Sequence, residues 1–416
     1  MSVTPVLEAD VLSRQDPELA EILRGELDRQ STTLQLTAAE NFASPAVLAT
    51  LGSALANKYA EGYPGSRYHG GCALADTAER IAVERARTLF GAEHANVQPH
   101  TGSSAMLAAY AAVLRPGDTV LALSLDDGGH LTHGSPANFS GRWFDFVGYG
   151  LDPGTGLVDH DEVRRLAREH RPKALVCGSI AYPRHFDHAF FRDVADEVGA
   201  YLIVALTHSA GLVAGGAAPN PVPYADLVCV TTHKTLRGPR GGLILCGAGL
   251  ARRVDRAVFP FTQGGAQMNS VAAKAVAFGE AATPAFAAYA HQTVANAHAL
   301  AGHLADAGFT VATGGTDTAL IVADPAPLGM DGRTARGRLA AAGLVLDCCA
   351  LAHTGGRALR LGTAAVTTQG MGEPAMARIA ALLVGVVSGA LDPAAARAEV
   401  RELTADFPPY PEWEPG

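Results

Sequence analysis

The chain has 416 residues, of which 48% are hydrophobic and only 18% are charged, with 32 Lys and Arg against 41 Asp and Glu. The apolar share excludes a disordered chain, and the lack of a Gly-X-Y period excludes collagen. A formal net charge of −9 argues against a protein built around nucleic acid or an anionic membrane surface. A chain of this length exceeds one ordinary core. We therefore expect a globular enzyme of two units that acts on a small molecule.

The N-terminal residues show no basic stretch followed by an apolar run, so no secretory signal is predicted. No stretch reaches the roughly 20 uncharged apolar residues that a membrane span needs. The most apolar one, Met376–Leu391, is diluted by Ala and Gly and is predicted to be a packed helix. We expect a cytoplasmic protein without a membrane or nucleic-acid partner.

The six cysteines show neither a CxxC spacing nor a pairing typical of a metal site. They are Cys72, Cys177, Cys229, Cys246, Cys348 and Cys349. Three lie inside apolar runs, where a reduced cysteine is a small hydrophobic residue. The vicinal pair Cys348–Cys349 also allows a redox-active pair or a soft-metal contact, but ordinary packing is the simpler interpretation.

From Gly91 to about Gly247, short apolar runs alternate with amphipathic stretches. The predicted strands are Thr119–Leu125, Ala174–Gly178, Tyr201–Ala205, Leu227–Thr231 and Gly242–Cys246. The predicted helices are Ser103–Leu114, Asp159–His170 and Phe190–Val198. Continuous apolar runs are typical of a parallel sheet with helices on both faces. We therefore expect an open α/β layer whose functional residues lie at the carboxyl ends of its strands.

Ala-rich helical stretches follow at Ala266–Ala288 and Gln292–Ala307, and then a strand-like run at Ala319–Ala323 and a helix at Gly332–Ala342. These elements predict a smaller second unit.

We divide the chain into an N-terminal arm (1–30), a large domain (31–290) and a small C-terminal domain (291–416). The arm is charged and helical in pattern without a core of its own, so we expect it to lie on a partner. The tail, Phe407–Gly416, is rich in Pro and acidic residues and is expected to be poorly ordered.

The strongest chemical signal is Lys234, which follows the predicted strand Leu227–Thr231 and precedes a Gly- and Pro-rich turn. A lysine at the end of a buried strand is partly removed from water. Desolvation destabilises its ammonium form, and the neutral amine is a nucleophile that can form a Schiff base. A lysine that merely reaches solvent is the simpler alternative, but the flanking His233 and Arg240 favour a site.

Two further segments contain residues suited to chemistry. Thr101, Gly102 and Ser103 begin a predicted helix, whose free N–H groups and dipole suit a phosphate, although Ser and Thr also occur there as plain caps. His130 and His133 lie in a Gly-rich loop after a strand. Two His without a third ligand nearby do not favour a metal, so no metal site is predicted.

Six long blocks of sequence, in this order, support a family resemblance. They are AENFASP (Ala39–Pro45), NKYAEGYPGSRYHGG (Asn57–Gly71), FGAEHANVQPHTGS (Phe90–Ser103), GGHLTHGSPANFSG (Gly128–Gly141), THKTLRGPRGG (Thr232–Gly242) and LRLGTAAVTTQG (Leu359–Gly370). On these blocks the chain resembles serine hydroxymethyltransferase over nearly its whole length. The resemblance implies the α/β, aspartate-aminotransferase-like fold of pyridoxal-phosphate enzymes, with a large, mostly parallel sheet and a smaller α+β C-terminal domain.

The resemblance also implies a homodimer with shared active sites, pyridoxal phosphate as cofactor and tetrahydrofolate as a second ligand. The matched catalytic residues are Lys234, which forms the internal aldimine, Glu61, His130 and His208. The matched cofactor-binding residues are Thr101, Gly102, Ser103, His130, His208, His233 and Lys234, with Tyr59, Gly264 and Gly265 from the partner subunit. The matched substrate or pterin contacts are Arg360, which binds an amino-acid carboxylate, Tyr68, His69, Leu125, Gly129, Leu131 and Arg240.

Departures from the family cluster in the cofactor pocket. Ala205 stands where the family has the aspartate that pairs with the pyridinium nitrogen. Without that partner the ring is a poorer electron sink, which argues against ordinary glycine–serine chemistry. The other departures are Ala39, His69, Ile180, Asp126–Asp127 and the folate-seating segment Asp347–Cys349.

Three hypotheses follow. The favoured one is a specialised transferase that performs aldol, retro-aldol or hydroxymethyl transfer on a non-standard amino acid or aldehyde through a Lys234 aldimine. The second is a folate-dependent one-carbon transferase that works without pyridoxal phosphate, because the losses fall on the coenzyme side. The third is a non-catalytic paralogue that partners a true hydroxymethyltransferase, which the retained Lys234 and Glu61 argue against.

Overall fold

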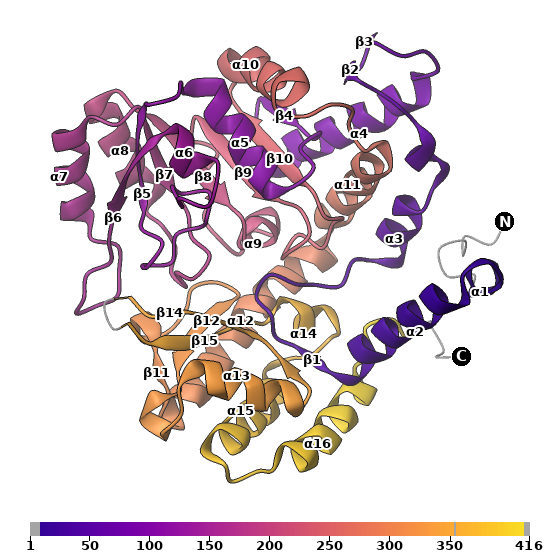
Figure 1. Cartoon of the computed structure of the whole chain (residues 1–416), viewed down its shortest axis with the longest axis vertical. Helices are drawn as coiled ribbons and strands as arrows, with labels where there is room; N and C mark the ends of the chain where they lie inside the picture. The colour runs from indigo at the N-terminus through magenta and orange to yellow at the C-terminus, as the bar shows by residue number, and fades with distance from the viewer. Residues whose placement is uncertain (1–8, 353–354, 412–416) are drawn as a thin grey trace.

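The computed structural model describes residues 9–352 and 355–411, and Figure 1 shows two layered units, one above the other. The upper unit is built on a seven-stranded sheet of order β4-β10-β9-β8-β7-β5-β6. Its strands are β4 (His94–Asn96), β5 (Thr119–Leu123), β6 (Asp145–Tyr149), β7 (Ala174–Cys177), β8 (Tyr201–Leu206), β9 (Leu227–Thr231) and β10 (Gly242–Cys246). Pairing is parallel from β9 to β6, whereas β10 is antiparallel to both β9 and β4. The expected α/β class with a mostly parallel sheet is confirmed.

Helices cover both faces of this sheet. Its strands carry apolar side chains on both faces, and these have to be buried. In β8, Leu202 and Val204 pack with helices on one face, and Ile203 and Ala205 pack with helices on the other. The first face is covered by α4 (Ala73–Phe90), α7 (His160–His170), α8 (His188–Val198) and α11 (Met268–Ala281), and the second by α5 (Gly102–Val113) and α10 (Ala251–Arg256). The continuous apolar runs predicted this arrangement.

Polar caps determine where the helices beside the sheet begin. An Asp159 carboxylate oxygen accepts from the Glu162 N–H at 2.9 Å, and Asp187 accepts from the Phe190 N–H at 3.0 Å. Each cap satisfies an N–H group that has no partner inside its helix. Gly199 then ends α8 in a left-handed conformation with φ of 72°.

The lower unit is a four-stranded sheet of order β11-β12-β15-β14. Its strands are β11 (Thr310–Val311), β12 (Leu320–Asp324), β14 (Asp347–Ala350) and β15 (Arg357–Gly362). Helices α13 (Gly332–Ala341), α15 (Glu373–Ser388) and α16 (Pro393–Asp406) pack on it. The packed helix predicted near Met376–Leu391 is confirmed by α15, whose Met376 and Leu383 are fully buried.

The single helix predicted over Ala266–Ala288 is wrong. The chain forms α11 and then starts α12 (Pro284–Asp306) after a break at Ala282–Thr283. Proline has no N–H to continue a helix but fits its first turn, and the Thr283 hydroxyl caps the new helix.

Helix α12 joins the two units, as Figure 1 shows. Its first turns place Phe286 and Tyr289 in the core of the large unit. Its later turns place Leu300 and Leu304 in the core of the small unit. The boundary proposed near residue 290 falls within this helix and stays a prediction.

The N-terminal segment forms α1 (Ala9–Gln15), α2 (Pro17–Thr32) and β1 (Leu34–Gln35), which pairs with β13 (Leu344–Val345). Ile22 and Leu23 of α2 are 59% and 54% exposed. These apolar side chains fit the expectation that the arm lies on a partner, which stays a prediction. The shorter elements are α3 (Pro45–Leu51), β2 (Gly62–Tyr63), β3 (Ser66–Arg67), α6 (Ser140–Trp143), α9 (Ala210–Ala214) and α14 (Ala364–Thr368).

The tail was expected to be poorly ordered, and over residues 407–411 this is wrong. Gln369 donates to the Phe407 carbonyl at 2.7 Å, and the Tyr410 hydroxyl donates to the Ala43 carbonyl at 3.2 Å. The Tyr410 ring also lies edge-on to Phe42. These contacts of Phe407 and Tyr410 fix the segment in spite of its Pro-rich composition. The rest of the predicted segment, residues 412–416, lies outside the described residues.

All six cysteines are free, as expected. Cys177, Cys229 and Cys246 are buried in β7, β9 and β10. Cys348 and Cys349 are neighbours in β14, so their side chains point to opposite faces of that strand. Packing accounts for the vicinal pair.

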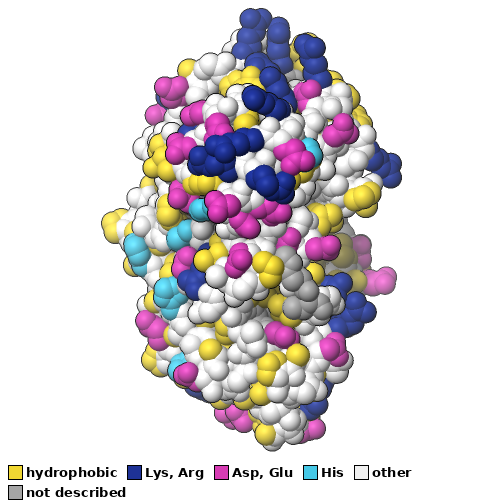
Figure 2. Space-filling view, turned by 90° about the vertical axis from the view of Figure 1, so that its left-hand side faces the viewer, with side chains coloured by type: hydrophobic (Ala, Val, Ile, Leu, Met, Phe, Trp, Pro, Cys, Tyr) yellow, Lys and Arg dark blue, Asp and Glu magenta, His cyan; other side chains and the backbone are white. Residues whose placement is uncertain are grey.

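Acidic and basic side chains are interspersed in the upper half of the face in Figure 2, the side on which α7 lies in Figure 1. Arg164 and Arg168 of α7 pair with Glu197 of α8, and Arg165 pairs with Glu169. The arginines of this helix are therefore neutralised locally.

Candidate active site

Lys234 lies in a tight turn directly after β9. The Gly238 N–H donates to the Thr232 carbonyl at 2.8 Å, and the Arg237 N–H donates to the Lys234 carbonyl at 3.0 Å. A Cβ at Gly238 would lie 2.8 Å from the Thr232 oxygen, so the turn requires glycine there. The Gly- and Pro-rich turn after the strand therefore holds Lys234 at the carboxyl end of β9, as predicted.

The Lys234 amine is held by His208, which follows β8. Lys234 Nζ lies 3.0 Å from His208 Nε2, and His208 Nδ1 lies 3.2 Å from the Ala38 carbonyl. A carbonyl can only accept, so Nδ1 carries the proton and Nε2 presents a lone pair to the amine. Burial holds the pKa of His208 well below its usual range, so this histidine orients the amine without taking its proton.

Lys234 has a strongly lowered basicity. Burial, followed by the positive charges of Arg360 and Arg240, lowers its pKa to about 7. About half of the amine is therefore neutral at pH 7. A nucleophilic lysine needs this property.

His130 lies close enough to Lys234 and Arg360 to be coupled to both electrostatically. Its Nδ1 accepts from the Thr132 N–H at 3.2 Å, so its proton lies on Nε2. Burial lowers the pKa of His130 to about 4, and that of His233 also to about 4. Both rings are neutral at pH 7 and add no positive charge to the site.

The first turn of α5 packs against the end of β9, next to the lysine turn. Thr101 caps the helix, and a Cβ at Gly102 would lie 2.3 Å from the Thr231 hydroxyl. Within the described residues, the N–H groups of Gly102 and Ser103 make no hydrogen bond. Thr101 and Ser103 are exposed. These free donors and the helix dipole suit a phosphate.

Lys274 on α11 supports this phosphate turn, and sequence reasoning missed it. Its fully buried ammonium donates to the carbonyls of Val97, Pro99 and Gly242 at 2.7, 3.0 and 2.9 Å. The Gly242 N–H in turn donates to the Pro99 carbonyl. The lysine thus ties the strand before the turn to β10. Nothing in an Ala-rich helix indicated a functional lysine.

A second missed network fixes the backbone of Lys234. Asn41 donates to the Lys234 carbonyl at 3.0 Å and also lies 2.9 Å from the Tyr289 hydroxyl. That hydroxyl donates to the Thr235 carbonyl at 3.2 Å. Asn41 lies in the AENFASP block, which could have pointed to it. Tyr289 gave no sequence signal.

Arg360 lies on β15 and reaches the large unit. It donates to the Ile180 carbonyl at 3.0 Å and to the Asp347 carboxylate at 2.9 Å. The Ile180 N–H donates to the Gly128 carbonyl, which links this contact to the His130 loop. The same loop requires Gly129, because a Cβ there would lie 2.2 Å from the Leu123 carbonyl.

A second group of predicted residues gathers elsewhere on the chain. His69 Nε2 lies 3.1 Å from Glu61, and its ring is edge-on to Tyr59 at 4.8 Å. Cβ atoms at Gly264 and Gly265 would contact Glu61. Among the described residues, no hydrogen bond or ion pair joins this group to Lys234, His208 or Arg360.

The remaining predicted residues lie at the surface or partly buried. Tyr68 and Leu131 are 75% and 58% exposed, Arg240 is exposed, and Leu125 is partly buried. No contact in the single chain tests their predicted roles.

A family model described as serine hydroxymethyltransferase matches residues 12–383 of the 416. The chain belongs to the serine hydroxymethyltransferase family. Members of this family generally use pyridoxal phosphate and tetrahydrofolate and are homodimers or tetramers that act on small molecules. The chain is therefore a hydroxymethyltransferase-like transferase in general terms.

The residues of this family member fit pyridoxal phosphate at two of three places. The free N–H groups of α5 suit the phosphate, and the Lys234 amine suits the aldehyde. At the third place, the ring nitrogen, the resemblance calls for an aspartate, and the chain has Ala205 on the α5 face of β8, which offers no carboxylate.

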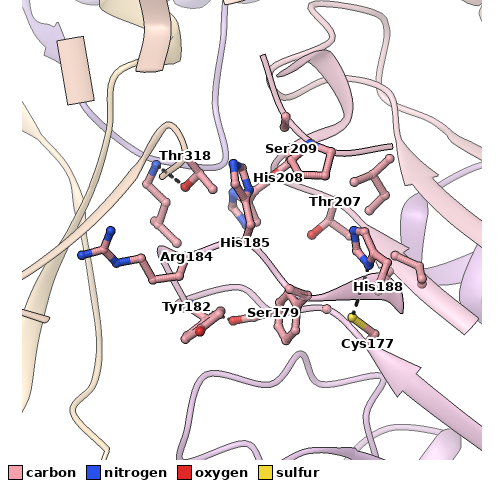
Figure 3. Close-up of a pocket in the computed structure, with 18 residues that line it drawn as sticks. Cys177, Ser179, Tyr182, Arg184, His185, His188, Thr207, His208, Ser209 and Thr318 are labelled. Carbon is pink, nitrogen blue, oxygen red and sulfur yellow. Dashed lines mark hydrogen bonds between the residues drawn. The ribbon is translucent and has the colours of Figure 1, made fainter. Parts of the chain in front are cut away.

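A cavity of about 50 Å³ beside His208 lies at the carboxyl ends of β7 and β8, as Figure 3 shows. Ser179, His185, His188 and Thr318 are among its lining residues. Burial lowers the pKa of His188 to about 4. The cavity has room for a few water molecules. It is too small for pyridoxal phosphate.

Residues 9–352 and 355–411 contain no cluster of three or more His, Cys, Asp or Glu that could hold a metal. In the same ranges, none of the helices combines the length and apolar character that crossing a membrane requires.

We predict that the Lys234 amine reacts with a small neutral aldehyde with a half-maximal rate near pH 7. Because the Arg360 charge lowers the Lys234 pKa, Arg360→Gln should move this midpoint to higher pH. Reductive trapping followed by peptide mass spectrometry measures it, with exposed Lys173 as the internal reference. A midpoint unchanged by the substitution would contradict the electrostatic cause.

Lys274→Met should destabilise the fold by about 3 kcal/mol, because it leaves three buried carbonyls without their shared hydrogen-bond donor. It should also weaken inorganic phosphate binding at α5. Chemical denaturation and phosphate titration measure the two effects, and Lys173→Met is the matched exposed control. A variant as stable as the wild type would show that Lys274 does not hold this loop.

Proposed function

We propose that the protein is a specialised hydroxymethyltransferase that performs aldol, retro-aldol or hydroxymethyl transfer on an amino acid or aldehyde other than the glycine–serine pair. The observation that carries this proposal is the Lys234 amine, which is buried, held by His208 and half neutral at pH 7. A non-catalytic paralogue would have no reason to retain this costly arrangement.

The chain's own residues would hold pyridoxal phosphate at three points. Thr101, Gly102 and Ser103 would bind its phosphate, Lys234 its aldehyde carbon, and His130 one face of its ring. The bound group supplies an electron sink for breaking or forming a bond next to an amine carbon. His208 keeps the Lys234 amine oriented, and the neutral His130 adds no further positive charge beside Lys234 and Arg360.

A second copy of the chain would complete the site. Tyr59, Glu61, Gly264 and Gly265 form a separate group in the single chain, and the Tyr59 ring is 61% exposed. In a homodimer they would face the partner's phosphate turn, with Glu61 placed to hold a proton on the transferred group. The exposed apolar side chains of α2 would cover the partner. Tyr68, Leu125, Gly129 and Leu131 would contact tetrahydrofolate.

A second candidate is a folate-dependent one-carbon transferase that works without pyridoxal phosphate. Ala205 is the observation that favours it, because a ring nitrogen without a carboxylate binds and reacts less well. Coenzyme binding separates the two candidates.

Incubation with pyridoxal phosphate should give a visible absorption band that Lys234→Ala abolishes. The chain has only four lysines, so borohydride reduction and peptide mapping identify the attached one directly. Lys173→Ala is the control and should retain the band. No band in the wild type, with reduced folate still bound, would support the second candidate.

Ala205→Asp should increase the affinity for pyridoxal phosphate roughly tenfold, because it restores a charge-assisted hydrogen bond. Without coenzyme the same variant should have a lower unfolding midpoint, since it buries an unpaired carboxylate. Ala205→Asn, of similar size but neutral, is the matched control. Equal coenzyme affinity in the wild type and both variants would show that the ring nitrogen of the coenzyme does not lie next to residue 205.

A further inference from the structure

The carboxylate of Asp347 is paired with Arg360 by the strand register itself. Asp347 lies directly opposite Arg360 in the antiparallel pairing of β14 with β15. Side chains of directly opposite residues lie on the same face of a sheet with their Cβ atoms about 5 Å apart. The ion pair is therefore built into the backbone pairing.

Both terminal nitrogens of the Arg360 guanidinium donate to protein acceptors. Nη2 donates to Asp347 at 2.9 Å and Nη1 to the Ile180 carbonyl at 3.0 Å. Its Nε is buried and has no hydrogen-bond partner among the described residues. The Arg360 side chain is 13% exposed and that of Asp347 is 36% exposed. Nε is thus the buried nitrogen of this side chain that has a donor but no protein acceptor.

The charge of Arg360 already has a counter-charge in the protein before any ligand enters. Lys234 is half neutral at pH 7, and His130 and His208 are neutral there. Asp347 offsets the charge of Arg360. An incoming carboxylate would either displace Asp347 from Arg360 or lie next to a like charge, and both are unfavourable in a poorly solvated site.

We propose that Asp347 is a specificity residue that excludes a free carboxylate at Arg360, so that the substrate presents a neutral acceptor, a carbonyl or hydroxyl, to Arg360 Nε. The substrate class is then an amino-acid amide, an amino alcohol or a related neutral compound. This inference rests on the proposed function, in which the substrate reacts at Lys234, and it adds Arg360 as the second contact of that substrate.

The test compares glycinamide with glycine, and L-serinamide with L-serine, by calorimetric titration of the full chain incubated with pyridoxal phosphate. The wild type should bind each amide more tightly than the matching acid. Asp347→Asn should lower the amide-to-acid affinity ratio about tenfold, because it removes the like charge. Asp347→Ala should do the same. Asp324→Asn, a carboxylate removed from β12 of the same sheet, is the control and should leave the ratio unchanged.

Three results would overturn the inference: an unchanged ratio in Asp347→Asn, weaker glycine binding in that variant, or no binding of either ligand. Weaker glycine binding would show that Asp347 merely positions Arg360 for a carboxylate. Absorption spectra of the same samples test the proposed function separately. A missing coenzyme band refutes that function, whereas the calorimetric ratio alone decides the role of Asp347.

Discussion

A lysine amine is nucleophilic near neutral pH only when its ammonium form is destabilised. In this fold that happens at the contact between Lys234 and His208. Burial supplies the destabilisation, and the arginine charges add to it. The histidine would compete for the proton if it were basic. Burial of His208 prevents this by lowering its pKa. One cause, the removal of water, therefore lowers the pKa of both side chains.

The surrounding framework keeps these two side chains in place through backbone carbonyls. Asn41 holds the carbonyl of Lys234, the Ala38 carbonyl fixes the tautomer of His208, and Lys274 gathers three carbonyls beneath the phosphate turn. Each contact joins segments far apart in the chain. The site is thus a meeting point of backbone segments, which explains why long blocks around Lys234 match the family while single pocket residues differ.

The sequence predicted what depends on local pattern. The apolar runs predicted the first and last residues of β9 and β10 correctly. The Gly- and Pro-rich turn predicted that Lys234 lies at the carboxyl end of β9. The prediction of one helix across Pro284 was wrong because it followed the Ala-rich composition and ignored that a proline starts a new helix. The partners of Lys274 and the pairing of Asp347 with Arg360 could not be predicted, since they depend on strand register and on packing between distant segments.

Helix α12 begins in one hydrophobic core and ends in the other. Its Tyr289 hydroxyl lies within hydrogen-bonding distance of Asn41 and the Thr235 carbonyl, on either side of the Lys234 backbone. Arg360, which donates to the Ile180 carbonyl of the large unit, belongs to the unit at the far end of that helix. A rotation of the small unit would therefore move Arg360 and, through Tyr289, disturb the hydrogen bonds that hold the Lys234 backbone.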